Sequence, residues 1–524
     1  MPIRKTRLPH SNSRLPRIAR TRRIILKPSM KLADLAAAVP GAVIEEGGDV
    51  EISGLAYDSR HLGPGDLFVA VRGLSVDGHS FVAEAAGRAA AVAVERLSGI
   101  PAGTPTLRLP STRRGLAELA AAFYGRPSRH LRLAGVTGTD GKTTTTHLAA
   151  HLLDACGLPC GAMSTVSFMA AGQTSSNDTG QTTIEAPELQ AWLRRLVDQG
   201  LAHAVVEVTS HALVQERVGA CDFDVAAFTY IGRDHLDYHP TWEDYVAAKG
   251  TLIDLTSSSA SKGLPKTVVL NRDDASYDAL AQHPIERRWS YSLGDSADIR
   301  AADLLPASGG WRFQLATPFG EAPVQLPLLA RFNVYNALCA AGICLALGAD
   351  LSGVAEGFGS FRGVPGRLQR VDLGQPFAVY VDFAHSAGSL ASALAELRPL
   401  TENRLIAVFG TTARSDHDRP GMGRAAALGS DFFVITTDDP VEEDPAEIAR
   451  EVAAGVEARS PGKDYEIILD RRTAIRHAIE LARPGDVVLL AGKGHERTMV
   501  TAKGREPWDE VGEAEAAIRE VLNT

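Results

Sequence analysis

Short runs of apolar, largely β-branched residues alternate with longer helical stretches over most of the chain. Runs of this length between helices predict buried strands of a largely parallel sheet. Polar residues follow directly after several of them, and open α/β sheets bind ligands at the carboxyl ends of their strands. The runs are Ala204–Val208, Val225–Thr229, Lys266–Leu270, Leu405–Phe409, Phe432–Ile435 and Val487–Leu490.

Residues before position 129 predict a separate, smaller α/β unit. Residues 31–38 fit a short helix, Leu67–Val71 a strand, and residues 82–95 a helix followed by a strand. A second unit begins near Arg132, and Gly363–Arg367 fits a joint between a central and a C-terminal unit. We therefore expect a three-domain α/β protein. Its domains would span residues 30–128, 129–363 and 364–524.

The composition is that of a globular protein, with 45% hydrophobic and 22% charged residues in a chain of 524. No apolar run approaches the roughly 20 residues of a membrane span, so we expect no membrane association. The five cysteines fit neither a disulfide framework nor a zinc ribbon, which indicates a reducing, cytoplasmic location. They are Cys156, Cys160, Cys221, Cys339 and Cys344.

Residues 1–29 form a basic tail with nine lysine and arginine residues and no acidic one. Such a tail could contact nucleic acid or anionic lipid. Met30, however, opens a well-patterned segment, which favours a disordered extension or a start codon assigned too early. We expect no nucleic-acid partner.

A phosphate-binding loop is the strongest chemical signal. Residues 138–144, GTDGKTT, follow the strand-like Leu131–Val136 and precede the helix-like Thr143–Ala155. Glycines let backbone N–H groups face phosphates, Lys142 reaches the terminal phosphates, and the Thr143 hydroxyl can hold Mg²⁺. Val136 stands where the strict pattern has glycine. The alternative is an ordinary glycine turn, but the order of strand, loop and helix favours a nucleotide site.

The loop sequence GVTGTDGKTT resembles GxTGTNGKTT, the signature of the Mur ligase family, with Asp140 where asparagine is usual. Further motifs follow in family order between residues 30 and about 510: AYDSRHLGPGDLFVAVRG, EVTSHALVQERV, RDHLDYHPTWEDYVAAK, RFNVYNAL, GVPGR, DFAHSAGSL and AGKGHE. The resemblance implies a small α/β UDP-binding N-terminal domain and a central P-loop ATPase domain with a mostly parallel sheet. It also implies a Rossmann-like C-terminal domain that binds an incoming amino acid.

The resemblance also implies an activity. The chain would be an ATP-dependent ligase of peptidoglycan precursor synthesis that adds the third amino acid to UDP-N-acetylmuramoyl-L-alanyl-D-glutamate through an acyl phosphate. Lys142 and two Mg²⁺ ions would stabilise the phosphoryl transfer. The partners would be the UDP-dipeptide and an amino acid, and we expect a monomer.

Metal ligands and catalytic residues carry over by motif. Taken singly, each is as well explained as a salt-bridged structural residue. The resemblance implies that Thr143 and Glu207 hold one Mg²⁺, and that His235 and a carbamylated Lys249 hold the second. Carbamylation needs a neutral amine, which a buried lysine can supply. The catalytic set is therefore Lys142, Glu207, His235 and Lys249.

Substrate contacts carry over in the same way, with ordinary caps and turns as the alternative. ATP contacts would be Gly138, Thr139, Asp140, Gly141, Lys142, Thr143, Thr144, Asn271, Asn333, Asn336, Arg367, Asp382 and His385. UDP-substrate contacts would be Tyr57, Ser59, Thr182, Thr183, Thr209, Gln215 and Arg217. Amino-acid contacts would be Arg414, Asp438, Asp439, Pro440, Val441, Gly492 and Glu496. Tyr230 stands where the family usually has asparagine, which puts that contact in doubt.

The identity of the added amino acid is predicted from residues 438–441, DDPV, where diaminopimelate enzymes of the family carry Asp-Asn-Pro-Arg. Val441 offers no donor to a distal carboxylate, and an unpaired buried charged group costs about 1–3 kcal/mol or more. Asp439 and the acidic residues 442–444 would suit an ammonium group, although a solvated surface run is the alternative. We therefore expect L-lysine or L-ornithine, with meso-diaminopimelate as the alternative.

Two rival functions remain. A sister ligase would add D-Ala-D-Ala or extend folylpolyglutamate, but the AYDSRHLGPGDLFVA and EVTSHALVQ segments argue against both. A non-catalytic homologue usually loses a P-loop lysine or a metal ligand. Here all five such residues are present: Lys142, Thr143, Glu207, His235 and Lys249.

Overall fold

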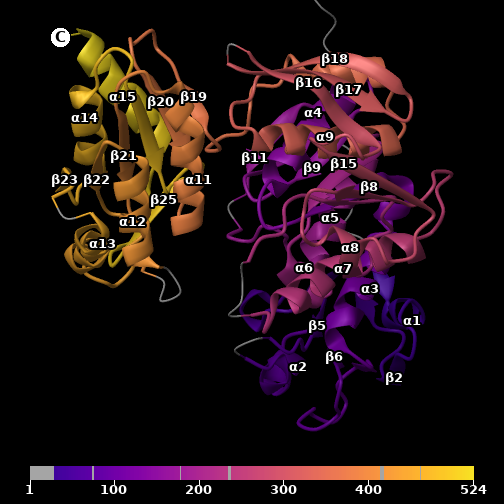
Figure 1. Cartoon of the computed structure of the whole chain (residues 1–524). Helices are drawn as coiled ribbons and strands as arrows, with labels where there is room; N and C mark the ends of the chain where they lie inside the picture. Colours follow the sequence, from indigo (N-terminus) through magenta and orange to yellow (C-terminus); the bar gives the residue numbers. More distant parts are fainter. Residues whose placement is uncertain are drawn as a thin grey trace, which may run out of the picture.

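The computed structural model describes residues 29–73, 76–177, 179–233, 238–307, 309–413, 418–460 and 462–523. Three larger sheets follow one another along this part of the chain (Figure 1). The predicted basic tail falls outside the described residues except for Ser29, and so do His235 and Arg414. None of the described helices combines the length and apolar character that a membrane span requires.

The N-terminal unit is built on a five-stranded sheet in the order β2-β7-β6-β5-β4. Its strands pair in parallel except at β2 and β7, and the helices predicted near residues 32 and 82 are present. The elements are β1 (Met30–Lys31), α1 (Leu32–Ala37), β2 (Val43–Glu46), β3 (Glu51–Ile52), β4 (Gly54–Ala56), η1 (Ser59–His61), β5 (Asp66–Val69), η2 (Gly78–Phe81), α2 (Val82–Ala86), β6 (Ala91–Val94), β7 (Thr106–Arg108), α3 (Thr112–Phe123) and η3 (Pro127–His130).

The central unit has an eleven-stranded sheet in the order β11-β10-β9-β12-β8-β13-β14-β15-β16-β17-β18. The run from β9 to β16 is parallel, which confirms the predicted buried parallel strands. Antiparallel strands close both edges, a feature that the apolar runs did not predict. Helices α4 and α9 pack on one face, and α5 and α7 on the other (Figure 1).

Elements of the central unit are β8 (Arg132–Thr137), α4 (Lys142–Ala155), β9 (Cys160–Met163), β10 (Ser167–Ala170), β11 (Gln173–Ser176), α5 (Ala186–Asp198), β12 (His203–Glu207), α6 (Ser210–Val214), β13 (Val225–Phe228), α7 (Trp242–Ser258), β14 (Thr267–Asn271), α8 (Tyr277–Leu280), β15 (Arg287–Ser292), β16 (Ile299–Ala307), β17 (Gly310–Thr317), β18 (Gly320–Leu326), α9 (Phe332–Ala346) and α10 (Leu351–Phe358).

The C-terminal unit has a six-stranded sheet in the order β19-β20-β24-β21-β22-β23, parallel from β20 onward. Helices cover both faces, as expected of a Rossmann-like unit. Its elements are β19 (Gln369–Val371), β20 (Ala378–Asp382), α11 (Ala387–Leu397), η4 (Arg398–Leu400), β21 (Leu405–Phe409), α12 (Arg419–Gly429), β22 (Phe432–Ile435), α13 (Pro445–Arg459), β23 (Tyr465–Ile467), α14 (Arg471–Leu481), β24 (Val487–Ala491), β25 (Thr498–Thr501), β26 (Gly504–Pro507) and α15 (Glu510–Asn523).

A tight turn joins the central and C-terminal sheets. The Arg367 N–H donates to the Val364 carbonyl at 3.1 Å, and Gly366 has a φ of 67°. Proline at the second position and a left-handed glycine at the third are the signature of a type II turn. The exact domain boundaries stay a prediction, but each of the three predicted segments contains a sheet of its own.

Candidate active site

The phosphate-binding loop connects β8 to α4 in the centre of the large sheet. A Cβ atom at Gly141 would lie 2.3 Å from Asn336 Oδ1, and one at Gly138 would lie 1.9 Å from Thr229 Oγ1. Both glycines are therefore required by close packing as well as by positive φ. Helix α4 begins without a side-chain cap, which leaves its first N–H groups available to an anion.

Thr143 and Glu207 lie together at this loop. The Thr143 hydroxyl is 3.2 Å and 3.1 Å from the two Glu207 carboxylate oxygens, and Glu207 is 1% exposed. Strands β8 and β12 are parallel neighbours, so their carboxyl ends bring the two residues to one edge. A hydroxyl beside a buried carboxylate is a hard-oxygen donor set of the kind that Mg²⁺ binds.

Thr165 also binds Glu207, although the sequence motifs did not predict it. Its N–H donates to one carboxylate oxygen at 2.9 Å and its hydroxyl to the other at 3.1 Å. The Thr182 hydroxyl lies 3.0 Å from the Thr165 hydroxyl and can donate to it. Thr165 follows the end of β9, so its position after an apolar strand was the signal that could have found it.

Lys249 reaches the phosphate-binding loop from helix α7, whose N-terminus is capped by Thr241 as predicted. Its side chain is 1% exposed, and its ammonium donates to the Gly138 carbonyl at 2.8 Å. The ammonium also lies 4.3 Å from the centre of the Tyr245 ring. The structure therefore brings Lys249 to the candidate phosphate-binding loop, and its role as a metal ligand stays a prediction. Lys142 lies at the same loop and donates to the Thr139 carbonyl at 2.7 Å.

The predicted UDP-substrate residues of the central unit form one cluster. Thr183 donates to the Glu207 carbonyl at 2.9 Å, and Thr209 caps α6. Arg217 donates to the Thr183 carbonyl at 2.7 Å and to Gln215 Oε1 at 2.8 Å. These hydrogen bonds leave N–H groups of Arg217 for a ligand, because a guanidinium has five.

Residues of the N-terminal unit meet this cluster from the other side. Glu185, 7% exposed by side chain, lies 3.0 Å from Arg113 of α3 and 3.1 Å from Arg217. Tyr57 donates to Glu188 at 3.2 Å, and burial raises the pKa of its phenol. The Ser59 carbonyl accepts from Arg88 within the N-terminal unit. Glu185 and Arg113 were not predicted.

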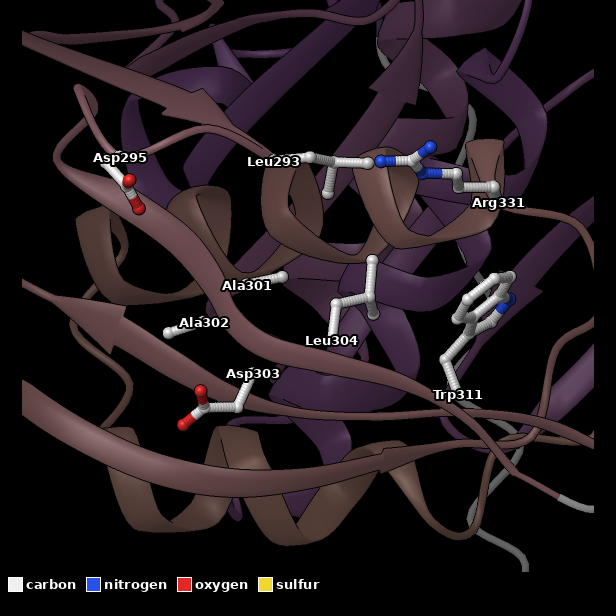
Figure 2. A pocket seen from close by; sticks show the side chains of 8 residues that line it. All are labelled: Leu293, Asp295, Ala301, Ala302, Asp303, Leu304, Trp311 and Arg331. Atoms are coloured by element: carbon white, nitrogen blue, oxygen red, sulfur yellow. The ribbon is translucent and has the colours of Figure 1, made fainter.

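The predicted adenine contacts lie at the ends of β14 and α9. Asn336 donates to Asn333 at 3.0 Å, and Asn271 accepts from the Asp273 N–H at 3.1 Å. A cavity of about 430 Å³ adjoins the start of α9. Figure 2 shows Arg331 and Trp311 on one side of it and Asp295 and Asp303 on the other, with Leu304 between them.

Arg367, Asp382 and His385 gather around Phe383 in the C-terminal unit. The Arg367 guanidinium lies 4.9 Å from the Phe383 ring centre, and His385 Nδ1 donates to the Phe383 carbonyl at 2.7 Å. Burial raises the pKa of Asp382, and the Arg367 charge opposes this. Burial, with Arg367 second, lowers the pKa of His147 on α4 to about 4. The charge of Arg367 therefore acts on His147 of the helix that follows the phosphate-binding loop.

A further cluster contains four charged residues next to Gly492: Asp438, Asp439, Lys493 and Glu496. Lys493 is 2.8 Å from Asp439 and 2.5 Å from Glu496. A Cβ atom at Gly492 would lie 2.4 Å from Asp438 Oδ2, so only glycine fits there. Residues 439 and 441 both have positive φ, and the Val441 N–H donates to the Val500 carbonyl at 3.1 Å.

Comparison with known proteins assigns the chain to one family. Models of the Mur ligase family match in chain order: the catalytic domain at residues 51–124, the middle domain at 136–344 and the glutamate ligase domain at 366–494. UDP-N-acetylmuramyl-tripeptide synthetase of Roseiflexus sp. (strain RS-1) is 42% identical over 486 residues, covering 90% of this chain and 95% of that protein. The chain belongs to the Mur ligase family.

Other Mur ligases carry a more specific name. UDP-N-acetylmuramoyl-L-alanyl-D-glutamate–2,6-diaminopimelate ligase of Geobacillus thermodenitrificans (strain NG80-2) is 40% identical, covering 94% of this chain and 100% of that protein. A solved structure of a ligase with that name superposes with a TM-score of 0.67 and 30% identity, over 95% of this chain and 100% of that one. This Mur ligase is an ATP-dependent ligase of peptidoglycan precursor synthesis.

One interpretation of the sequence needs correction in this Mur ligase. The acidic residues 442–444 were expected to suit a substrate ammonium. Glu443 instead pairs with Arg419 at 2.9 Å, and Asp444 caps helix α13. Asp439 and Glu496 already have an ammonium between them, that of Lys493. Most of the acidic residues that were expected to bind a basic substrate side chain are therefore already paired or cap a helix.

Proposed function

We propose that this Mur ligase adds the third amino acid to UDP-N-acetylmuramoyl-L-alanyl-D-glutamate. The observation that carries the proposal is the convergence of Thr143 and Thr165 on Glu207, with Thr182 beside Thr165 and Lys249 at the adjoining loop. This arrangement puts the candidate nucleotide site beside the candidate UDP-substrate site. The names of relatives that are about 40% identical over most of the chain support the same step.

The mechanism is acyl-phosphate ligation. The γ-phosphoryl group of ATP passes to the side-chain carboxylate of D-glutamate, the amine of the amino acid attacks the carbonyl carbon, and phosphate leaves. Negative charge spreads over the phosphoryl oxygens during transfer. Lys142 and the N-terminus of α4 stabilise that charge. Arg367, whose charge helps to lower the pKa of His147 on α4, adds a second positive group.

The metal ligands fit the donor chemistry of Mg²⁺, which neutralises phosphate charge when bound. Thr143 and Glu207 would hold one ion. His235 and Lys249 would hold the second after CO₂ adds to the neutral Lys249 amine with loss of a proton. Lys249 is the buried lysine that reaches this loop from α7, and CO₂ addition would replace its contacts with the Gly138 carbonyl and the Tyr245 ring, both of which favour the cation.

The amino acid that this proposal names first is meso-diaminopimelate. Several relatives carry that amino acid in their names, and Lys493 already neutralises the acids expected to select lysine. Its distal carboxylate must then find donors other than Val441. L-Lysine or L-ornithine is the second candidate, because the Val441 side chain offers no donor. The monomeric state and the cytoplasmic location stay predictions.

The test is ligation by the purified chain with ATP, Mg²⁺ and the UDP-dipeptide. Diaminopimelate, lysine and ornithine compete at equal concentration, and the products are identified by mass spectrometry. We expect phosphate release that requires both substrates, and a diaminopimelate product. A lysine or ornithine product would keep the third-residue step and refute diaminopimelate; Val441→Arg should then gain diaminopimelate use. Ligation only of D-Ala-D-Ala to a UDP-tripeptide would overturn the step itself.

A further inference from the structure

Lys493 lies in the loop after β24 with its side chain 0% exposed. Its ammonium is 2.5 Å from Glu496 and 2.8 Å from Asp439, and Asp438 follows at 3.8 Å. Burial alone would lower the pKa of Lys493, but the three carboxylates outweigh it and the pKa is raised. Lys493 is therefore a buried cation at neutral pH.

The three carboxylates around Lys493 are close enough to share a metal ion. Their ligand atoms all lie within 4.8 Å of one another. Carboxylates at that spacing cannot all ionise without a cation between them. Among the described residues, every ion pair of Asp438, Asp439 and Glu496 goes to Lys493.

A second buried cation, Arg471, makes its hydrogen bonds to other groups. It donates to both carboxylate oxygens of Glu510, with bonds of 2.6 Å and 3.0 Å, and to the Ala491 carbonyl at 2.7 Å. Neither carboxylate oxygen of Asp438 has a hydrogen-bond partner in the described part of the chain. Burial raises the pKa of Asp438, and the charges of Arg471 and then Lys493 oppose this, whereas Asp439 and Glu496 form their ion pairs with Lys493.

Glu496 connects the buried lysine to open space. Its side chain is 37% exposed and helps to line a cavity of about 230 Å³, together with Gln369, His495 and Arg497. Asp439 is held by the same ammonium and also accepts from the Val500 N–H at 2.8 Å. One buried cation thus holds two carboxylates, of which Glu496 lines the cavity.

We propose that Lys493 is a positioning residue for the incoming amino acid: an internal cation that stands in for a metal ion and holds Asp439 and Glu496 where they receive the substrate amine. The proposal rests on the proposed function and on the family motifs, which predict that these acids contact the amino acid. Lys493 binds one carboxylate oxygen of Glu496, Oε2, so the other oxygen of this partly exposed side chain can accept from the substrate amine.

The first test is Lys493→Met, which keeps the length of the side chain and removes its charge. The KM for the amino acid should rise about tenfold or more, because Glu496 loses a charge-assisted partner. The KM values for ATP and the UDP-dipeptide should change little. Lys503→Met, on the exposed turn between β25 and β26, is the matched control and should leave all three KM values unchanged. An unchanged amino-acid KM in Lys493→Met, or an equal rise in all three, would overturn the proposal.

The second test reads the charge without the reaction. Without the ammonium, the three acids should bind Mn²⁺, so Mn²⁺ should raise the Tm of Lys493→Met by several degrees more than that of the wild type or Lys503→Met. Equal shifts would overturn the metal-like role. A wild-type chain that ligates none of the amino acids would instead overturn the proposed function, while the Mn²⁺ shift still decides the role of Lys493. If Lys493→Met does not fold, Lys493→Gln, which also removes the charge and keeps all three acids, is measured in its place.

Discussion

Lys249 is the single residue on which the metal chemistry depends most. Replacement by alanine removes the side chain that reaches the Gly138 carbonyl, and with it the carbamate proposed as a metal ligand. We expect kcat of Lys249→Ala to fall about 100-fold or more, the scale for removing one electrostatic group from a transfer site. Formate or acetate should restore part of the activity, because either anion can replace the lost carbamate.

Lys142→Ala is the matched control for that experiment. It removes a cation from the same loop, so added carboxylates should not restore its activity. Steady-state phosphate release is measured for both variants with and without about 0.1 M acetate. Because the two variants are compared in the same buffer, ionic screening is equal for both. Near-normal activity of Lys249→Ala without any supplement, or equal rescue of both variants, would refute the carbamate.

Residue pairing marks the limit of what could be predicted from the sequence. Thr143, Glu207 and Lys249 were found because each stands in a motif or after an apolar strand. Lys493 was passed over although its motif was recognised, because its partner Asp439 is 54 positions away. The acidic run 442–444 was misinterpreted for the same reason: the partner of Glu443, Arg419, lies 24 positions earlier. Local pattern shows which charges exist, not which charges neutralise one another.

At the scale of elements, helices α3 and α5 join the N-terminal and central units through a nearly buried carboxylate. Glu185 precedes α5 and binds Arg113 of α3 and Arg217 at once. Glu185→Gln should raise the KM for the UDP-dipeptide about tenfold, because loss of one charge-assisted bond frees Arg217 to move. The KM for the amino acid should not change.

A surface pair on the same helix provides the control for Glu185. Asp198 pairs with Arg194 across one turn of α5, with both side chains partly exposed. Exposed pairs contribute about 0–1 kcal/mol, so Asp198→Asn should leave Tm and the KM for the UDP-dipeptide near those of the wild type. A Glu185→Gln variant that behaves like Asp198→Asn would show that the pairing of α3 and α5 does not position Arg217.

Strands of the sheet interior were predictable and those of the edges were not. Continuous apolar runs such as Leu405–Phe409 are buried on both faces, and this one coincides with β21. The edge strands β16, β17 and β18 carry exposed polar residues among their buried ones. They pair antiparallel with one another, β16 also being the last strand of the parallel run, and a search for apolar runs does not find them.

For the whole molecule, the decisive junction is the turn at Val364–Arg367. Its place between two units was predicted from the Pro-Gly sequence and the family motif. Its packing was not, because the turn lies against a loop more than a hundred positions later. A Cβ atom at Gly366 would lie 2.2 Å from the His495 N atom and 2.4 Å from the Gly494 carbonyl carbon. The turn at Val364–Arg367 therefore packs tightly against the loop that carries Lys493 and Glu496.

Gly366→Ala tests whether the turn at Val364–Arg367 sets the geometry of the candidate amino-acid site. Gly374→Ala is its matched control, since Gly374 also has a positive φ, 92°, but no atom within 4 Å of its Cβ position. Both variants bear the left-handed strain of about 1–2 kcal/mol; only Gly366→Ala must also displace the 494–495 backbone. We expect Gly366→Ala to lower Tm further and to raise the KM for the amino acid severalfold, whereas Gly374→Ala lowers Tm alone. Thermal unfolding and steady-state ligation measure the two effects, and equal changes in both variants would mean that the turn joins the domains without setting the geometry of the site.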